Sequence, residues 1–403
     1  MASSEKPTEF WRCGRCGTPN PLTSYLAQCV ACGASRGEGT MLASKAPAPK
    51  PTAPAKSPSL WLRVLSLAYL TWLMVILVVM RTLGDLWAPA TILLFLPRFL
   101  WAAPLPLLGW WTWRRRDRWI ALAQVVSLLL VLGPIMNFRL PLGRFFRDAL
   151  PPDRLRVLSL NQSTNPIDLD AVKKLMEQER IDVVCFQEGP IQSGAPDPRL
   201  VKILTTLGWS FTSTQRIASR LPILSESHYK KDPYPEYGFW AVRIHQVKVR
   251  TRSGRAVWVA DIHMPTVRIG FQRLLEGDLG ALGRLNQWRQ KQVEVLLAQT
   301  LGHSDDPIVI AGDFNTPPES RLLDPLRDLG QFGFDEVGLG YGYTRPSSLA
   351  FVAIDHIVAT PQWVFTRCEV GPDVGSDHLP VIAELALPAP SKKARSAESE
   401  PGA

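Results

Sequence analysis

The feature that most restricts how this chain can fold is a run of apolar residues, "WLRVLSLAYLTWLMVILVVM" at 61–80, which contains a single charge. Twenty helical residues rise about 30 Å, which is the thickness of the hydrocarbon core of a bilayer. A similar run, "WIALAQVVSLLLVLGPIMNF", occupies 119–138, and we expect Gly133 and Pro134 to kink it. These two runs predict transmembrane helices.

The apolar stretch between these runs is less regular, because it contains Pro97, Arg98, Pro104 and Pro106. The window that best fits a membrane span begins near Leu94. The sequence therefore predicts a membrane region at 59–140 with three transmembrane helices, at about 61–80, 94–113 and 119–138.

Charge predicts the orientation of these helices. The short basic loop "RRRDR" at 114–118 is typical of a cytoplasmic loop. Three spans then put the N-terminus in the cytoplasm and the C-terminal part outside it, in an integral protein of the cell (inner) membrane. Arg139, Arg144 and Arg147 follow the third span and favour the opposite orientation. Since much of the net charge of +9 lies beside apolar segments, it is weak evidence for nucleic-acid binding.

Four cysteines lie close together near the N-terminus, in "WRCGRCGTPNPLTSYLAQCVACG". Two C-x2-C pairs separated by twelve residues can close a tetrahedral zinc site, so we expect Zn²⁺ to be bound by Cys13, Cys16, Cys29 and Cys32. We place a zinc ribbon at 1–40 and a Pro/Ala/Lys linker at 41–58. Two further cysteines, Cys185 and Cys368, are expected to be small hydrophobic residues of the core.

The cysteine segment resembles the Ran-binding type of zinc finger, with Trp11 before the first cysteine and Asn20 after the second. The spacing from Asn20 to Cys29 is two residues longer than in that family. The resemblance implies a protein or RNA partner, with Trp11 stacking on a base. A structural ribbon that binds a protein is the favoured alternative.

Short apolar strands alternate with helical stretches over 150–390, and each strand ends in polar residues. These candidate site residues are Asn161, Glu188, His263, Asp313, Asn315, Asp355, Asp377 and His378. Carboxylate and amide oxygens favour Mg²⁺, Mn²⁺ or Ca²⁺ over zinc, and together with histidines they suit metal-assisted hydrolysis of a phosphoester by an attacking water. Alternation puts Asp261 on the same face as His263, and Gln187 is expected to brace its strand end.

The ordered motifs "LSLNQ", "VVCFQE", "ADIHMP", "AGDFN", "IDHIV" and "SDHLPV" resemble the endonuclease/exonuclease/phosphatase superfamily, which has the fold of deoxyribonuclease I. The resemblance implies an α+β fold, a four-layer α/β/β/α sandwich, with Mg²⁺ or Mn²⁺. Glu188, Asn161 and Asp377 would surround the metal. Asp313 would align or deprotonate the water, and Asn315 would bind a phosphate oxygen. His378, oriented by Asp355, would act as base or hydrogen-bond donor, and His263, with Asp261 as its partner, would support the phosphate or leaving group.

The substrate stays open at this point. We expect a membrane-anchored phosphodiesterase or phosphatase that acts on lipid headgroups or extracellular nucleic acid. The alternatives are an extracytoplasmic nuclease and a catalytically silent membrane adaptor whose ribbon binds a partner. Residues 391–403 are expected to form a disordered tail.

Overall fold

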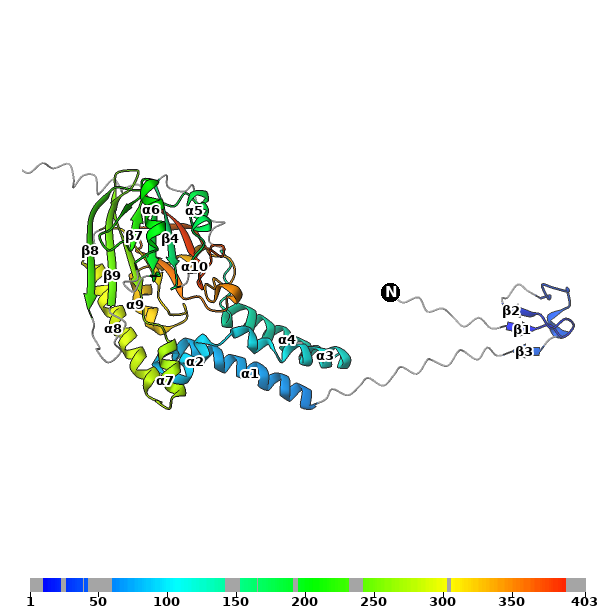
Figure 1. Ribbon diagram of the computed structural model, residues 1–403. Coiled ribbons are helices and arrows are strands. Elements are labelled where there is room, and N and C mark those ends of the chain that lie inside the picture. Colours follow the sequence, from blue (N-terminus) through cyan, green and yellow to red (C-terminus); the bar gives the residue numbers. More distant parts are fainter. Residues whose placement is uncertain are drawn as a thin grey trace, which may run out of the picture. The chain divides into compact units, whose positions relative to one another are not determined.

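The computed structural model describes residues 10–22, 27–38, 40–42, 60–141, 153–164, 166–190, 195–231, 242–302 and 306–388. The chain forms two compact units, 1–59 and 60–403, and each is described by itself (Figure 1). Nearly all of the expected linker at 41–58 and the whole expected tail at 391–403 lie outside the described residues.

The first unit contains a small antiparallel sheet. Its strands are β1 (Phe10–Arg12), β2 (Pro19–Pro21) and β3 (Thr40–Leu42), in the order β2-β1-β3, with a 3-10 turn η1 (Arg36–Glu38). Trp11, Cys13 and Cys29 form its buried core. Because this core contains so few apolar residues, we expect the cysteine cluster to stabilise the unit as well.

The second unit begins with two long apolar helices, α1 (Leu60–Thr82) and α4 (Arg118–Leu130), the latter continuing into a π-helical turn, η4 (Val131–Ile135). Both are long and apolar enough to cross a membrane. Near their starts Arg63 pairs with Asp117 at 2.8 Å, and near their ends Arg81 donates to the carbonyl of Pro134 at 3.3 Å. The two helices therefore run in the same direction. The π-helical turn contains Gly133 and Pro134, where the sequence predicts a kink.

The middle apolar segment is not the single helix expected at 94–113. It consists of η2 (Gly84–Leu86), α2 (Ala88–Phe95), η3 (Arg98–Ala102) and α3 (Leu105–Arg115), with a bend of 88° after α2. Pro97 and Pro104 lie at the two breaks, because proline offers no backbone N–H and disfavours helical geometry in the residue before it.

These short elements nevertheless pack along α1 in the reverse direction. Leu94 packs with Ile76 and Met80, the Tyr69 hydroxyl donates to the carbonyl of Trp101, and the rings of Trp111 and Trp61 lie 5.2 Å apart. The middle segment thus runs antiparallel to α1 and α4.

Two mixed six-stranded sheets form the rest of this unit. One has the order β12-β13-β11-β10-β9-β8, and the other β14-β15-β4-β5-β7-β6. The strands of the first are β8 (Ile223–Lys231), β9 (Val242–Arg250), β10 (Ala256–His263), β11 (Ile308–Asp313), β12 (Gln331–Phe332) and β13 (Asp355–Ala359). Those of the second are β4 (Asp153–Asn161), β5 (Val183–Gln187), β6 (Ser210–Phe211), β7 (Ile217–Ser219), β14 (Val364–Val370) and β15 (Val381–Leu387).

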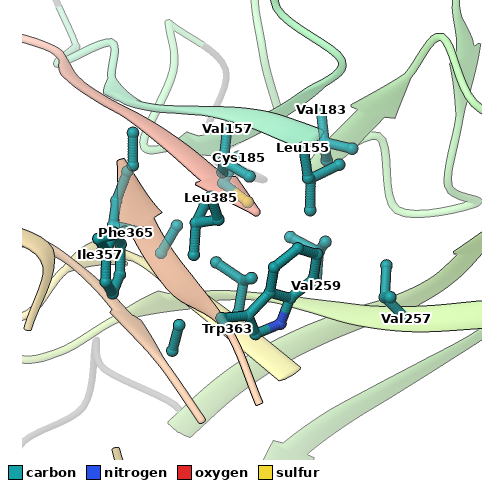
Figure 2. Packing of buried hydrophobic residues seen from close by; sticks show 14 of the residues in the cluster. Leu155, Val157, Val183, Cys185, Val257, Val259, Ile357, Trp363, Phe365 and Leu385 are labelled. Atoms are coloured by element: carbon teal, nitrogen blue, oxygen red, sulfur yellow. The ribbon is translucent and has the colours of Figure 1, made fainter. Parts of the chain in front are cut away.

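The main core lies between these sheets. Figure 2 shows Val157 and Leu385 of one sheet facing Val259 and Ile357 of the other, and Cys185 and Cys368 are buried in the same cluster. The helices α5 (Leu169–Gln178) and α6 (Pro198–Thr206) cover the outer face of the second sheet. The helices α8 (Ala281–Leu301) and α9 (Asp324–Leu329) cover that of the first. Helix, sheet, sheet and helix are the four layers that the sequence predicts.

Further short elements are α7 (Arg268–Leu275), η7 (Arg321–Leu323), α10 (Gly333–Val337) and η8 (Ser347–Leu349). Helix α7 contacts the apolar region 60–140, where Phe271 packs against Phe95 of α2 with ring centroids 6.1 Å apart. Leu282, Leu285 and Trp288 continue this apolar contact along α8.

Strand direction explains why the candidate residues meet. The strands β4 and β5 are parallel, with Asn161 opposite Gln187, and β10 and β11 are parallel, with His263 opposite Asp313. The antiparallel strand β13 begins at Asp355, which lies opposite Asp313. Because the carboxyl ends of parallel strands lie at one edge, both sheets deliver their polar ends to the same place.

Candidate active site

Asp313 is the centre of the site and is fully buried at the end of β11. Its Oδ1 accepts a hydrogen bond from the Asn315 backbone N–H at 2.7 Å, and its Oδ2 accepts from the side-chain amides of Asn161 at 2.9 Å and Asn315 at 3.0 Å. Burial raises the pKa of Asp313 to about 7, and the nearby Asp355 carboxylate adds to this. Three amide donors therefore hold a carboxyl group that can exchange a proton near neutral pH.

Glu188 and His263 form one side of the site. The His263 Nε2 lies 3.6 Å from both Glu188 Oε1 and Asp313 Oδ2, and Asn161 Nδ2 lies 3.4 Å from Glu188 Oε1. Burial lowers the pKa of His263 to about 3, so its imidazole is neutral and can offer a lone pair. Both Glu188 (φ 53°) and Asn315 (φ 46°) adopt the left-handed region, which non-glycine residues occupy at a cost.

His378 and Asp355 form the opposite side. The His378 Nδ1 lies 2.9 and 3.1 Å from the two Asp355 oxygens, and its Nε2 lies 3.8 Å from Asp313 Oδ2. Burial acts to lower the pKa of His378, but the carboxylates of Asp355 and Asp313 outweigh it and raise this pKa to about 9. Asp355 therefore fixes the orientation of the ring and stabilises its positive charge.

Arg345 is a site residue that the sequence reasoning missed. Its Nη1 lies 2.9 Å from His378 Nε2, and its Nη2 donates to Asp377 Oδ2 at 2.6 Å. A planar guanidinium beside a catalytic histidine is well suited to a phosphate. Arg345 belongs to no recognised motif. The sequence signal that could have identified it is its position ten residues before Asp355, in the segment that leads to the sheet edge where the other candidate residues lie.

Two expected site residues have contacts that the sequence did not predict. Asp377, expected beside the metal with Asn161 and Glu188, pairs with Arg345 and is 38% exposed in its side chain. Asp261, expected as the partner of His263, instead accepts a hydrogen bond from Gln187 Nε2 at 2.6 Å, and burial raises its pKa to about 7. Gln187 also donates to the carbonyl of Cys185 at 3.1 Å, so it braces the strand end as expected and joins the two sheets.

The donor set fits a divalent cation. Within the described part of the chain, ligand atoms of Glu188, His263 and Asp313 lie within 4.8 Å of one another, as do those of Asp313, Asp355 and His378. Asp377 belongs to neither group. The carboxylates of Glu188 and Asp313, with the neutral imidazole of His263 between them, are the kind of donor set that Mg²⁺ or Mn²⁺ occupies.

The four N-terminal cysteines also meet. Cys13 Sγ lies 3.5 Å from Cys32 Sγ, Cys16 Sγ lies 3.5 Å from Cys29 Sγ, and all four sulfurs are within 4.8 Å of one another. Asn20 Nδ2 approaches the Cys29 sulfur at 3.5 Å. This arrangement matches a Cys₄ zinc site. Trp11, however, is 1% exposed, so it is a core residue and not the base-stacking surface that the resemblance would imply.

Comparison with known proteins identifies the family. Residues 156–378, more than half of the chain, match the family model described as endonuclease/exonuclease/phosphatase family. No curated protein sequence matches the chain.

Several solved structures are similar in outline. A family member from Bacteroides thetaiotaomicron is 14% identical and covers 60% of this chain and 100% of its own, with a TM-score of 0.45. A mannosyl-6-phosphatase of Bacteroides thetaiotaomicron VPI-5482 is 14% identical over 58% and 100%, with a TM-score of 0.43. The catalytic domain of human nocturnin, with bound sulfate, is 14% identical over 62% and 100%, with a TM-score of 0.43. Because this family model matches residues 156–378, the chain belongs to the endonuclease/exonuclease/phosphatase family, and membership indicates a hydrolase acting on phosphoester bonds.

Proposed function

We propose that this chain is a membrane-anchored, divalent-metal-dependent phosphoester hydrolase that acts on the phosphoester of a membrane lipid headgroup. The observation that carries the reaction is the placement of one buried carboxyl, Asp313, between a cation-binding group and a histidine–carboxylate pair. Metal-assisted phosphoester hydrolysis uses a bound cation, a group that aligns the attacking water and a hydrogen-bond donor to the phosphoryl group, all within a few ångströms of one another.

Each side chain has a role in this proposal. Glu188, with Asn161 beside it, holds Mg²⁺ or Mn²⁺, which when bound neutralises phosphate charge and makes the attacking water more acidic. Asp313 aligns the water and takes its proton, which its pKa near 7 favours. His378, held by Asp355, donates a hydrogen bond to the phosphoryl group, while Asn315 and Arg345 bind phosphate oxygens and neutral His263 supports the leaving group.

Membrane anchoring is supported by the surface of the region 60–140. Trp61, Trp72 and Trp113 are each 51% exposed or more, together with many leucines and valines of α1, α3 and α4. In water such a surface would be costly, whereas in lipid it is matched. Exposed apolar residues continue onto the catalytic part at Leu275 and Leu279, which are 89% and 80% exposed and lie next to the contact between α7 and α2.

The helix directions support three crossings. Because α1 and α4 run parallel and the middle segment runs antiparallel to both, the start of α1 at Leu60 and the end of η4 at Ile135 lie at opposite ends of the bundle. We propose that the N-terminus is cytoplasmic and that the catalytic part is extracytoplasmic, with a zinc ribbon at the N-terminus that binds a protein or RNA partner.

The position of the site supports the proposal of a lipid substrate. The turn 315–320, which begins with Asn315, contacts Asp85 and Arg98 of the middle membrane segment. On the other side of the site, Tyr343 lies two residues before Arg345. Its hydroxyl donates a hydrogen bond to the carbonyl of Met136, at the end of the proposed third span. Asn315 and Arg345, the two residues proposed to bind phosphate, therefore belong to segments that contact the ends of the apolar helices, and lipid headgroups are concentrated at such ends when helices span a bilayer.

The test uses the full-length protein in detergent micelles with Mg²⁺ or Mn²⁺. Its substrates are bis-p-nitrophenyl phosphate, phospholipid vesicles and plasmid DNA, and Asp313→Ala and His378→Ala are the inactive controls. Hydrolysis of the phospholipid that both substitutions abolish is expected. Cleavage of DNA alone would favour the nuclease, and silence on every substrate would favour the adaptor.

A further inference from the structure

A series of buried polar contacts connects the membrane region to the turn that carries Asn315. Its middle member is Arg289 of α8, which is fully buried. Arg289 Nη2 donates to the Asn315 carbonyl at 2.7 Å and to the Thr316 hydroxyl, while its Nη1 lies 3.6 Å from Asp85 Oδ1. A single guanidinium thus touches both the catalytic turn and the membrane segment.

Asp85 is the acid that balances this charge. It is 4% exposed in η2, between α1 and α2, and its Oδ2 accepts a hydrogen bond from the Ser320 hydroxyl at the far end of the same turn. Asn286 of α8 donates to the Asp85 carbonyl at 2.7 Å and to the Thr91 hydroxyl at 2.9 Å. Burial lowers the pKa of Arg289, and the Asp85 carboxylate acts against this.

A second buried ion pair, between Arg98 and Glu319, also holds the turn 315–320. Arg98 Nη1 and Nη2 donate to the two oxygens of Glu319 at 2.5 and 2.7 Å, in a bidentate arrangement. Arg98 is 2% exposed and Glu319 is 5% exposed, and Arg98 also donates to the carbonyl of Ile135 at 3.2 Å. Arg98 of the middle apolar segment therefore connects the end of the third apolar segment to this turn.

These polar contacts are more than general packing. Apolar contacts such as Phe95 with Phe271 already hold the membrane region against the catalytic part. The polar contacts instead converge on 315–320, whose first residue places its own N–H 2.7 Å from Asp313. A buried charge that loses its partner is strongly unfavourable, so the turn keeps this shape only while Asp85 and Arg98 are in place.

We propose that Asp85 and Arg98 of the membrane region are positioning residues of the hydrolase, which hold Asn315 and Asp313 in the reactive geometry through Arg289 and Glu319. This inference rests on the proposed function. Its consequence is that the catalytic part depends on its membrane segment for the chemical step, and not only for its location.

The experiment compares Asp85→Asn with Asp117→Asn in the full-length protein, in detergent with Mn²⁺ and bis-p-nitrophenyl phosphate. Asp117 is the matched control, because it is also a buried membrane-region acid paired with an arginine, at the other end of α1 and α4. Misplacement of about 1 Å in a reacting group costs up to about 100-fold in rate, so we expect Asp85→Asn to lower kcat by about tenfold while KM hardly changes. Asp117→Asn should keep the wild-type kcat.

Two further measurements separate positioning from loss of fold. In a double-mutant cycle, Asp85→Asn should add almost nothing to Arg289→Gln, because the acid acts through the guanidinium. Asp85→Glu keeps the charge and should restore most of kcat. Additive losses, or an Asp85→Glu variant as slow as Asp85→Asn, would overturn the proposal.

Hydrogen exchange gives a readout that does not depend on activity. We expect amides in the peptide 311–320 to exchange faster in Asp85→Asn than in Asp117→Asn. A wild-type protein that is inactive on all substrates would refute the proposed function, and the exchange rates would still decide the inference. Equal exchange in the two variants would refute the positioning role.

Discussion

Replacing Asp355 with asparagine tests the histidine–carboxylate pair. In the wild type, His378 Nδ1 lies within 3.1 Å of both Asp355 oxygens, and both side chains are almost completely buried. Asparagine has nearly the same shape but no charge, so it removes the ionic part of this contact. His378 then loses the stabilisation of its protonated form, while the amide oxygen can still accept a hydrogen bond from the ring.

The magnitude follows from the kind of bond. A hydrogen bond to a charged partner contributes about 1.5–3 kcal/mol, and each 1.4 kcal/mol is about tenfold in rate. If the whole contribution is expressed in the transition state, Asp355→Asn lowers kcat by about 10- to 100-fold. The assay is steady-state hydrolysis of bis-p-nitrophenyl phosphate by the full-length protein with saturating Mn²⁺.

Asp182→Asn is the matched control. Asp182 is also fully buried, and it accepts hydrogen bonds from Arg252 and from the Arg156 backbone N–H, but it precedes β5 at the opposite end of the sheets. It should lose stability in thermal unfolding and keep its kcat. If Asp355→Asn keeps more than half of the wild-type kcat, the proposed role of the pair is wrong.

Three other predictions concern separate features. Burial lowers the pKa of His245 to about 3, below its unfolded value near 6.5, so the stability it contributes is complete above pH 6.5 and is lost as the pH falls. In urea unfolding, His245 should lower the free energy of unfolding by about 2 kcal/mol as the pH falls from about 7.5 to 5. This pH-dependent decrease should be absent in His245→Leu. It should persist in His228→Leu, where the replaced side chain is exposed and lies opposite His245 on the neighbouring strand. Glu188→Gln should weaken Mn²⁺ binding in calorimetry by about tenfold or more, and unchanged affinity would exclude Glu188 as a ligand. Cys29→Ser should lower the zinc content measured by atomic absorption without changing kcat, and wild-type zinc content would refute the Cys₄ site.

The strand ends could be predicted from sequence because their signal is local. An alternating apolar run that stops at a polar residue is visible within ten residues, and this is why Asn161, His263 and Asp313 meet as expected. The order of the motifs then predicted the family and the four layers.

Contacts between distant segments left no such signal. Arg345 reaches His378 over thirty-three positions, and Arg289 reaches Asn315 over twenty-six positions. The same limit explains Asp377, which lies in a sharp motif but pairs with Arg345. In the apolar region 60–140, average hydropathy over a window conceals the two breaks, although Pro97 and Pro104 mark them.

The most direct test of the account is phospholipid hydrolysis by the full-length protein in nanodiscs with Mn²⁺, followed by ³¹P NMR. The account predicts release of a phosphorus-containing product or of its headgroup by the wild type, and no release by Asp313→Ala. A wild-type protein that binds Mn²⁺ but leaves the lipid intact, or an Asp313→Ala variant that is as active as the wild type, would contradict it.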